Sequence, residues 1–149
     1  MIPLSYAQRR LWFLNQLGEG VAHHIPFAVR LRGPLDPAVL RTALADVADR
    51  HAALRTVFPC HDGEPYQKIL PPGSVPTVLR VVECDEDALD VAITRAIREP
   101  IDITGERPFR SWLFVLGPAE HVLLVVMHNI AADRWSIGPL LRDLGAAFE

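Results

Sequence analysis

The chain has 149 residues, 50% of them hydrophobic and 22% charged, a composition typical of one ordinary globular domain with a real core. Its formal net charge of −3 offers no broad basic surface, so no nucleic-acid partner is expected. Two scattered cysteines argue against a disulfide framework or a zinc site, and no apolar run is long enough to span a membrane, so a cytoplasmic protein is the simplest prediction.

The first elements along the chain are predicted to be a helix, a strand and a second helix. A capping-box pattern at Ser5 begins a helix over 6–17. The alternating segment 25–33 predicts a strand with one face buried. Asp36, followed by a proline at the first helical position, begins a helix that runs to about Arg50.

The middle of the chain predicts a hairpin, a strand and a third helix. Segments 54–58 and 66–70 are apolar and flank a turn at Asp62-Gly63, which is typical of a β-hairpin. Segment 77–83 predicts a strand, and Asp85 then begins a helix with an apolar face.

The last third predicts an antiparallel pair of strands, 109–117 and 121–128, followed by a helix that begins at Ser136. The second strand is apolar nearly throughout, so it should be central and buried on both faces. The fold class expected is an α/β (α+β) sandwich with a mixed or antiparallel sheet flanked by helices. The chain ends at "LGAAFE", inside a helical pattern, which suggests an interrupted domain.

The loop after the apolar strand is the best candidate for a site, because it opens directly from a buried strand toward a helix N-terminus. His128 and Asn129 are neighbours, so their side chains should point to opposite sides, one to the core and one to a cavity. His128 is either a site residue or a hydrogen-bonded core histidine. Asp133 either caps the last helix or is buried against a cation, and Arg55 is the preferred partner.

Three segments together resemble the condensation domains of nonribosomal peptide synthetases. "LSYAQRRLWFL" (4–14) is similar to their opening motif, and "DRHAALRTVF" (49–58) to their second, with Ala52 where the family has glutamate. "MHNIAADRWS" (127–136) resembles the third motif, histidine-histidine-x-x-x-aspartate-glycine. The three motifs occur in the family order and cover the chain from end to end.

The resemblance implies a lobe like those of chloramphenicol acetyltransferase, two of which enclose a tunnel. Residues 1–149 would be the N-terminal lobe, and the C-terminal lobe is absent from this chain. It also implies peptidyl and aminoacyl carrier domains as donor and acceptor partners. Their 4'-phosphopantetheine arms would carry the substrates, and the lobe itself would bind no cofactor directly and no metal. The family forms a peptide bond by attack of the acceptor amine on the donor thioester.

Two positions depart from the third motif. The tunnel-facing histidine of the family corresponds to Asn129, whose side chain can donate and accept hydrogen bonds but cannot take a proton near neutral pH. Its glycine corresponds to Arg134, which either gates the tunnel or turns outward to solvent. Under the resemblance, His128 and Asp133 are the remaining motif residues, with Asp133 and Arg55 in structural roles.

The sequence leaves several functions open. The leading interpretation is the N-terminal lobe of a condensation domain, impaired by Asn129 and inactive as an isolated lobe. The alternative is a non-catalytic condensation-like module that recruits carrier domains or tailoring enzymes. A free-standing acyltransferase of the wider histidine-x-x-x-aspartate superfamily is a third interpretation, against which the first two motifs argue.

Overall fold

The structure is a computed structural model that describes residues 2–74, 79–131 and 142. Its helices and strands are, in chain order, β1 Ile2–Pro3, α1 Tyr6–Gln16, the 3₁₀ helix η1 Gly20–His23, β2 His24–Arg32, α2 Pro37–Arg50, the 3₁₀ helix η2 Ala52–Arg55, β3 Thr56–Val57, β4 Cys60–His61, β5 Glu64–Ile69, β6 Leu79–Glu83, α3 Glu86–Ile97, β7 Phe109–Gly117 and β8 Glu120–His128.

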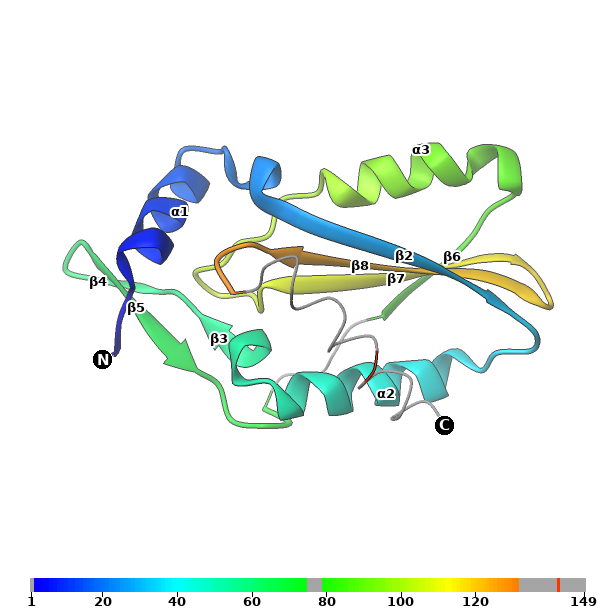
Figure 1. Ribbon diagram of the computed structural model, residues 1–149, viewed down its shortest axis with the longest axis horizontal. Helices are drawn as coiled ribbons and strands as arrows, with labels where there is room; N and C mark the ends of the chain where they lie inside the picture. Colours follow the sequence, from blue (N-terminus) through cyan, green and yellow to red (C-terminus); the bar gives the residue numbers. More distant parts are fainter. Residues whose placement is uncertain (1, 75–78, 132–141, 143–149) are drawn as a thin grey trace.

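The main sheet has the strand order β2-β8-β7-β6 and lies between α2 on one face and α3 on the other (Figure 1). β8 pairs antiparallel with both β2 and β7, whereas β6 pairs parallel with β7. The sheet is therefore mixed and flanked by helices, which confirms the expected fold class.

β8 is the central strand that its apolar sequence predicts. All its residues from His121 to His128 are buried. Leu123, Val125 and Met127 pack into the core with α2, while the alternate side chains, such as Leu124, pack into the core with α3. Because successive side chains of a strand point to opposite faces, one apolar strand supplies both cores.

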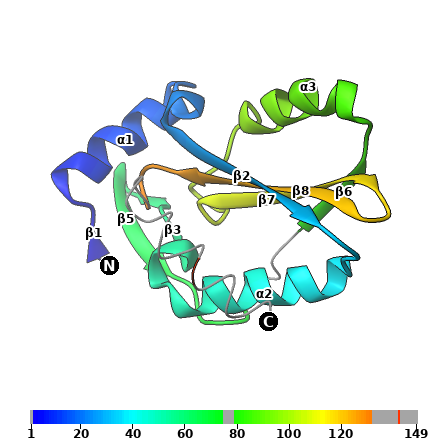
Figure 2. The ribbon, with the colours of Figure 1, turned by 45° about the vertical axis from the view of Figure 1, so that its right-hand side comes forward.

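A smaller sheet of β1, β5, β3 and β4 lies beside α1 at one end of the main sheet (Figure 2). A third apolar cluster joins α1, the segment after β3 and the turn after β8: it consists of Trp12, Phe58, Ile101, Ile103 and Ile130. The indole Nε1 of Trp12 donates a hydrogen bond to the carbonyl of Phe58 at 2.7 Å. These contacts hold the end of β8, where the candidate site lies, against the small sheet.

The predicted antiparallel pairing of segments 54–58 and 66–70 is confirmed in part, since β3 pairs with β5 through Thr56↔Ile69 and Val57↔Lys68. The turn is at Asp62-Gly63, as predicted, and both residues have positive φ, 50° and 79°. β4, which was not predicted, pairs with β5 directly at this turn, and segment 54–58 begins in the 3₁₀ helix η2 before it reaches β3. The hydroxyl of Thr56 donates to the carbonyl of Ala52 at 2.8 Å, so a local turn takes the place of the first strand residues.

Several sequence predictions fall outside the described residues: Asp133, Arg134, the cap at Ser136 and the last helix. The first residues of the predicted strand 77–83 are also outside them. Within the part of the chain that the structure describes, no helix has the length and apolar character needed to cross a membrane.

Candidate functional site: the turn after β8

His128 and Asn129 lie on opposite sides of the end of β8, as the strand alternation predicts. His128 is the last residue of β8 and is fully buried, with 0% of its surface exposed. Asn129 begins the following turn and is exposed. Of these two neighbouring residues, only Asn129 is therefore exposed to solvent.

Both ring nitrogens of His128 have partners. Nδ1 accepts a hydrogen bond from the backbone N–H of Ile130 at 3.1 Å, and Nε2 lies 3.2 Å from Oδ1 of Asn15 in α1. Because a backbone N–H can only donate, Nδ1 carries the lone pair and Nε2 carries the proton. Burial lowers the pKa of His128 to about 4, and the charges of His24 and His23 act in the same direction. His128 is therefore a neutral core residue that fixes the turn.

Three further bonds fix the backbone around Asn129. Its N–H donates to the carbonyl of His23 at 2.9 Å, and the N–H of Ala131 donates to the carbonyl of His128 at 3.1 Å. The side-chain amide of Gln8 donates to the carbonyl of Ile130 at 3.4 Å. The turn is thus bonded to α1, η1 and β8. The backbone that carries the Asn129 side chain is therefore held in place on both sides of that residue.

His24 lies beside His128 across the β2–β8 pair, with ring centroids 5.8 Å apart. Its Nδ1 is 2.7 Å from the carbonyl of Ile97 and must donate to it. Burial is the main cause that lowers the pKa of His24, so this ring is also neutral near pH 7. His24 itself begins β2, one residue before the strand expected over 25–33, and is half-buried. Among the residues that the structure describes, no group of three or more histidine, cysteine, aspartate or glutamate side chains could hold a metal ion.

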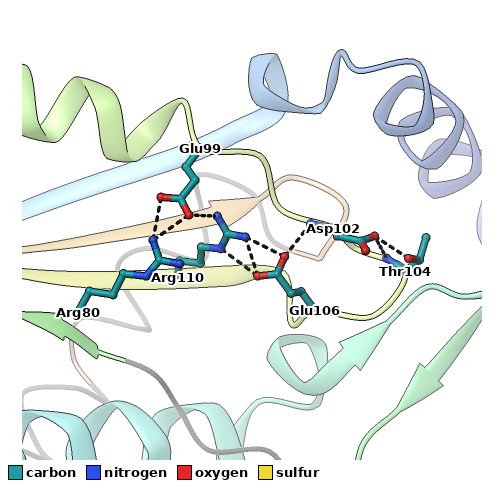
Figure 3. Close-up of polar contacts among 6 residues, drawn as sticks. All are labelled: Arg80, Glu99, Asp102, Thr104, Glu106 and Arg110. Atoms are coloured by element: carbon teal, nitrogen blue, oxygen red, sulfur yellow. Dashed lines mark hydrogen bonds and ion pairs between the residues drawn. The ribbon is translucent and has the colours of Figure 1, made fainter.

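The loop between α3 and β7 supports the site from below. The carbonyl of Ile97, the last residue of α3, receives a hydrogen bond from His24, and the carbonyl of Pro108, at the other end of the loop, receives one from the backbone N–H of His128 at 2.7 Å. An ion-pair network on the loop and the strands beside it connects the two ends of the loop (Figure 3). Arg110 lies 3.0 Å from Glu99 and 2.7 Å from Glu106.

The same network extends to the sheet edge and into the loop itself. Arg80 of β6 lies 2.8 Å from Glu99, and Glu106 also accepts the backbone N–H of Asp102 at 2.9 Å (Figure 3). The side chain of Arg110 is 16% exposed, so its two carboxylate partners compensate a largely desolvated charge. The network fixes the loop that follows the Ile97 carbonyl and ends at the Pro108 carbonyl, the two groups that bond the buried histidines.

Arg55, the predicted partner of Asp133, lies at the end of η2 and is half-buried. Its Nη1 donates to the carbonyl of Leu70 at 2.7 Å, and its buried Nε has no hydrogen-bond partner among the residues described. Burial lowers the pKa of nearby Arg107, Asp49 raises it, and the positive charge of Arg55 lowers it. The positive charges of Arg55 and Arg107 therefore act on each other here, an arrangement that a further carboxylate would stabilise.

The three sequence motifs meet in space at this site. Trp12 from the first and Phe58 from the second pack with Ile130 from the third in one buried cluster. A family model described as "Condensation domain" matches residues 1–149. The chain belongs to the condensation domain family.

Its relatives include nonribosomal peptide synthetases, so the resemblance stated from the three motifs is confirmed. This chain is 50% identical over 149 residues to the probable non-canonical nonribosomal peptide synthetase CymA of Salinispora arenicola. The match covers 99% of this chain and 2% of that protein. The chain is 48% identical over 148 residues to the dimodular nonribosomal peptide synthase of Bacillus subtilis, covering 99% and 6%.

A solved complex of the X-domain and OxyB from teicoplanin biosynthesis is also similar. The X-domain is 40% identical to the condensation chain, with a TM-score of 0.91, and the match covers 99% of this chain and 32% of that one. The chain therefore spans about a third of that solved chain and a few per cent of the curated synthetases.

Proposed function

We propose that these residues form the N-terminal lobe of a peptide-bond-forming condensation domain whose C-terminal lobe lies outside this chain. Carrier domains would deliver a donor acyl thioester and an acceptor aminoacyl thioester on 4'-phosphopantetheine arms. The lobe would bind no cofactor of its own, and a cytoplasmic location agrees with its two free cysteines, Cys60 and Cys84. Family membership and the relatedness to peptide synthetases support this proposal.

The observation that carries the finer proposal is the exposed Asn129 beside a fully buried His128. An asparagine amide can bind the acceptor amine or the thioester carbonyl, but it cannot accept a proton near neutral pH. His128 cannot take over that task, because its ring is enclosed and both nitrogens have partners. We therefore propose that the natural domain forms peptide bonds slowly, and that Asn129 contributes positioning alone.

The experiment uses the parent protein with both carriers loaded and measures the peptide on the acceptor carrier by mass spectrometry. Asn129→His restores a proton acceptor and should increase the rate by roughly 10²–10⁴-fold. Asn129→Gln is the matched control, since it keeps an amide and adds no base. Equal rates for the wild type and Asn129→His would show that residue 129 is not a general base.

Two neighbouring positions complete the proposed site. We propose that Asp133 pairs with Arg55 and holds the turn that orients residue 129. Removing either side chain should cost about 2–3 kcal/mol, less than the 3–5 of a fully buried pair because Arg55 is half-buried. A double-mutant cycle with Arg55→Ala and Asp133→Ala measures the coupling, and strictly additive losses would refute the pair.

We propose that Arg134 narrows the tunnel along which a phosphopantetheine arm enters, because it places a long cationic side chain where the family has glycine. Arg134→Gly should change which acceptors react even with Asn129 in place. Acceptors of increasing size, compared in the same peptide assay, separate this effect from a missing base. An unchanged acceptor profile would mean that Arg134 faces solvent.

The likeness to the X-domain favours a second function, a non-catalytic module that recruits carrier domains or tailoring enzymes. That X-domain was solved in a complex with OxyB, and it is 40% identical to this chain. The peptide assay distinguishes the two functions, because a recruiting module forms no peptide with either asparagine or histidine at position 129. It would instead bind, in size-exclusion chromatography, a purified tailoring enzyme encoded beside the parent gene. Peptide formation by Asn129→His would exclude this function.

A further inference from the structure

The hydrogen bond between Asn15 and His128 connects α1 to the turn that carries Asn129. Asn15 lies in the last turn of α1, 113 residues before His128, and its Oδ1 is 3.2 Å from Nε2 of the ring. Since Nδ1 already accepts the N–H of Ile130, Nε2 is the nitrogen that donates, and Asn15 is its acceptor. The chain of bonds therefore runs from Asn15 through one ring to the residue next to Asn129.

The backbone beside this bond is shaped to admit Asn15. A Cβ built on Gly20 would overlap Oδ1 of Asn15 and lie 2.8 Å from its Cγ. The φ of Gly20 is not in the positive range, so the restriction is one of space and not of backbone conformation. A side chain at position 20 would push the Asn15 amide away from His128.

The alternative tautomer of His128 would disrupt the turn. With its proton on Nδ1, the ring would present a donor to the N–H of Ile130, and two donors would face each other in a buried space. Near neutral pH the ring is uncharged, and the donor at Nδ1 and the acceptor at Nε2 both favour the neutral form with its proton on Nε2. The side chains of His23 and His24 are the titratable groups whose charges act on this ring.

We propose that Asn15 is a positioning residue for the site: it stabilises the Nε2–H tautomer of His128, the form that can accept the Ile130 N–H, and so holds Ile130 and the adjacent Asn129 in place. Gly20 is the residue that makes room for it. The inference that this improves peptide formation rests on the proposed function. The inference about the ring does not, since the tautomer is measured independently of activity.

The experiment records the ring signals of His128 by ¹⁵N NMR in the selectively ¹⁵N-histidine-labelled parent protein, assigned with a His128→Gln sample. We expect a protonated Nε2 and an unprotonated Nδ1 in the wild type and in Asn15→Asp, which keeps an acceptor oxygen. Asn15→Leu and Gly20→Ala should both shift the Nε2 signal, because they remove or displace its acceptor, and should increase the fraction of the ring protonated at Nδ1. Gly105→Ala is the matched control, because a Cβ there meets nothing within 4 Å.

A second measurement relates the ring to peptide formation. In the Asn129→His background, Asn15→Leu and Gly20→Ala should lower the rate by on the order of 10–100-fold, as expected when a reacting group is misplaced by a fraction of an ångström to 1 Å. Asn15→Asp should retain most of the rate. If Asn15→Leu does not fold, Gly20→Ala gives the decisive comparison with Gly105→Ala.

The possible failures are distinguishable. A wild-type ring protonated at Nδ1, or ring signals that stay unchanged in both Asn15→Leu and Gly20→Ala, would overturn the positioning role. The expected ring signals in a protein that forms no peptide with either asparagine or histidine at 129 would overturn the proposed function and leave the structural role of Asn15 standing.

Discussion

Replacing His128 by glutamine is expected to make the stability of the domain less sensitive to mild acid. The folded state holds the pKa of His128 at about 4, below the 6.5 of an exposed histidine, because the ring is fully buried. Below about pH 6.5 the unfolded chain binds a proton at this residue and the folded chain does not. The contribution of the neutral His128 ring to the free energy of unfolding is therefore fully present above about pH 6.5 and is lost as the pH falls toward 4.

The magnitude follows from these two pKa values. Each pH unit in this window costs about 1.4 kcal/mol per residue that takes up a proton only when unfolded. For His128 the total loss between about pH 6.5 and pH 4 is about 3 kcal/mol. His24 adds a loss of the same sign, since its pKa is also lowered. Glutamine cannot be protonated, so the contribution of His128 disappears in the variant.

The assay is chemical denaturation at several pH values between about 7 and 4.5, in which unfolding is monitored by a spectroscopic signal that reports on this lobe. The free energy of unfolding of the wild type should fall more steeply than that of His128→Gln, and the difference between them should change by about 2–3 kcal/mol over this range. His61→Gln is the matched control, because His61 is an exposed histidine in the β4–β5 hairpin. Parallel curves for the wild type and His128→Gln would refute the view of His128 as a neutral buried ring.

Three further substitutions test the fold around the site, each by chemical denaturation. Trp12→Phe removes the donor to the buried carbonyl of Phe58 and should cost about 1–3 kcal/mol; an unchanged midpoint would show that this bond is dispensable. Leu124→Ala empties a fully buried position of β8 and should cost about 2–5 kcal/mol, whereas the exposed Val91→Ala should change stability by less than about 0.5. Asp36→Ala removes the side chain that caps α2 and should cost about 1 kcal/mol, with Asp36→Asn retaining most of the stability; equal losses in both would argue against the cap.

Local patterns were enough to predict most elements of this fold. The capping residues of all three described helices, Ser5, Asp36 and Asp85, accept hydrogen bonds from the first turns as predicted. The apolar run 121–128 correctly indicated a strand buried on both faces. These features depend on residues within a few positions of one another, and the chain itself keeps such residues close.

The candidate site was predicted less completely. The motif directed attention to residues 128 and 129, and strand alternation assigned one to the core and one to the exterior. No sequence signal identified Asn15, Gln8 or Gly20 as site residues. Asn15 and Gln8 bond to residues more than a hundred positions away. Gly20 makes room for Asn15, so its role is visible only once that distant bond is known. A lone asparagine in a helix is indistinguishable by sequence from a solvated one.

By itself the sequence determined the family, the elements and the faces of its strands, because short-range periodicity, caps and motifs are written in adjacent residues. Only the tertiary structure decided that β6 joins the sheet in parallel, that residues 52–55 form a 3₁₀ turn, and that His24 and Asn15 flank His128. Hydrogen bonds act over about 3 Å, and only the packed sheet brings groups so distant in the sequence within that range.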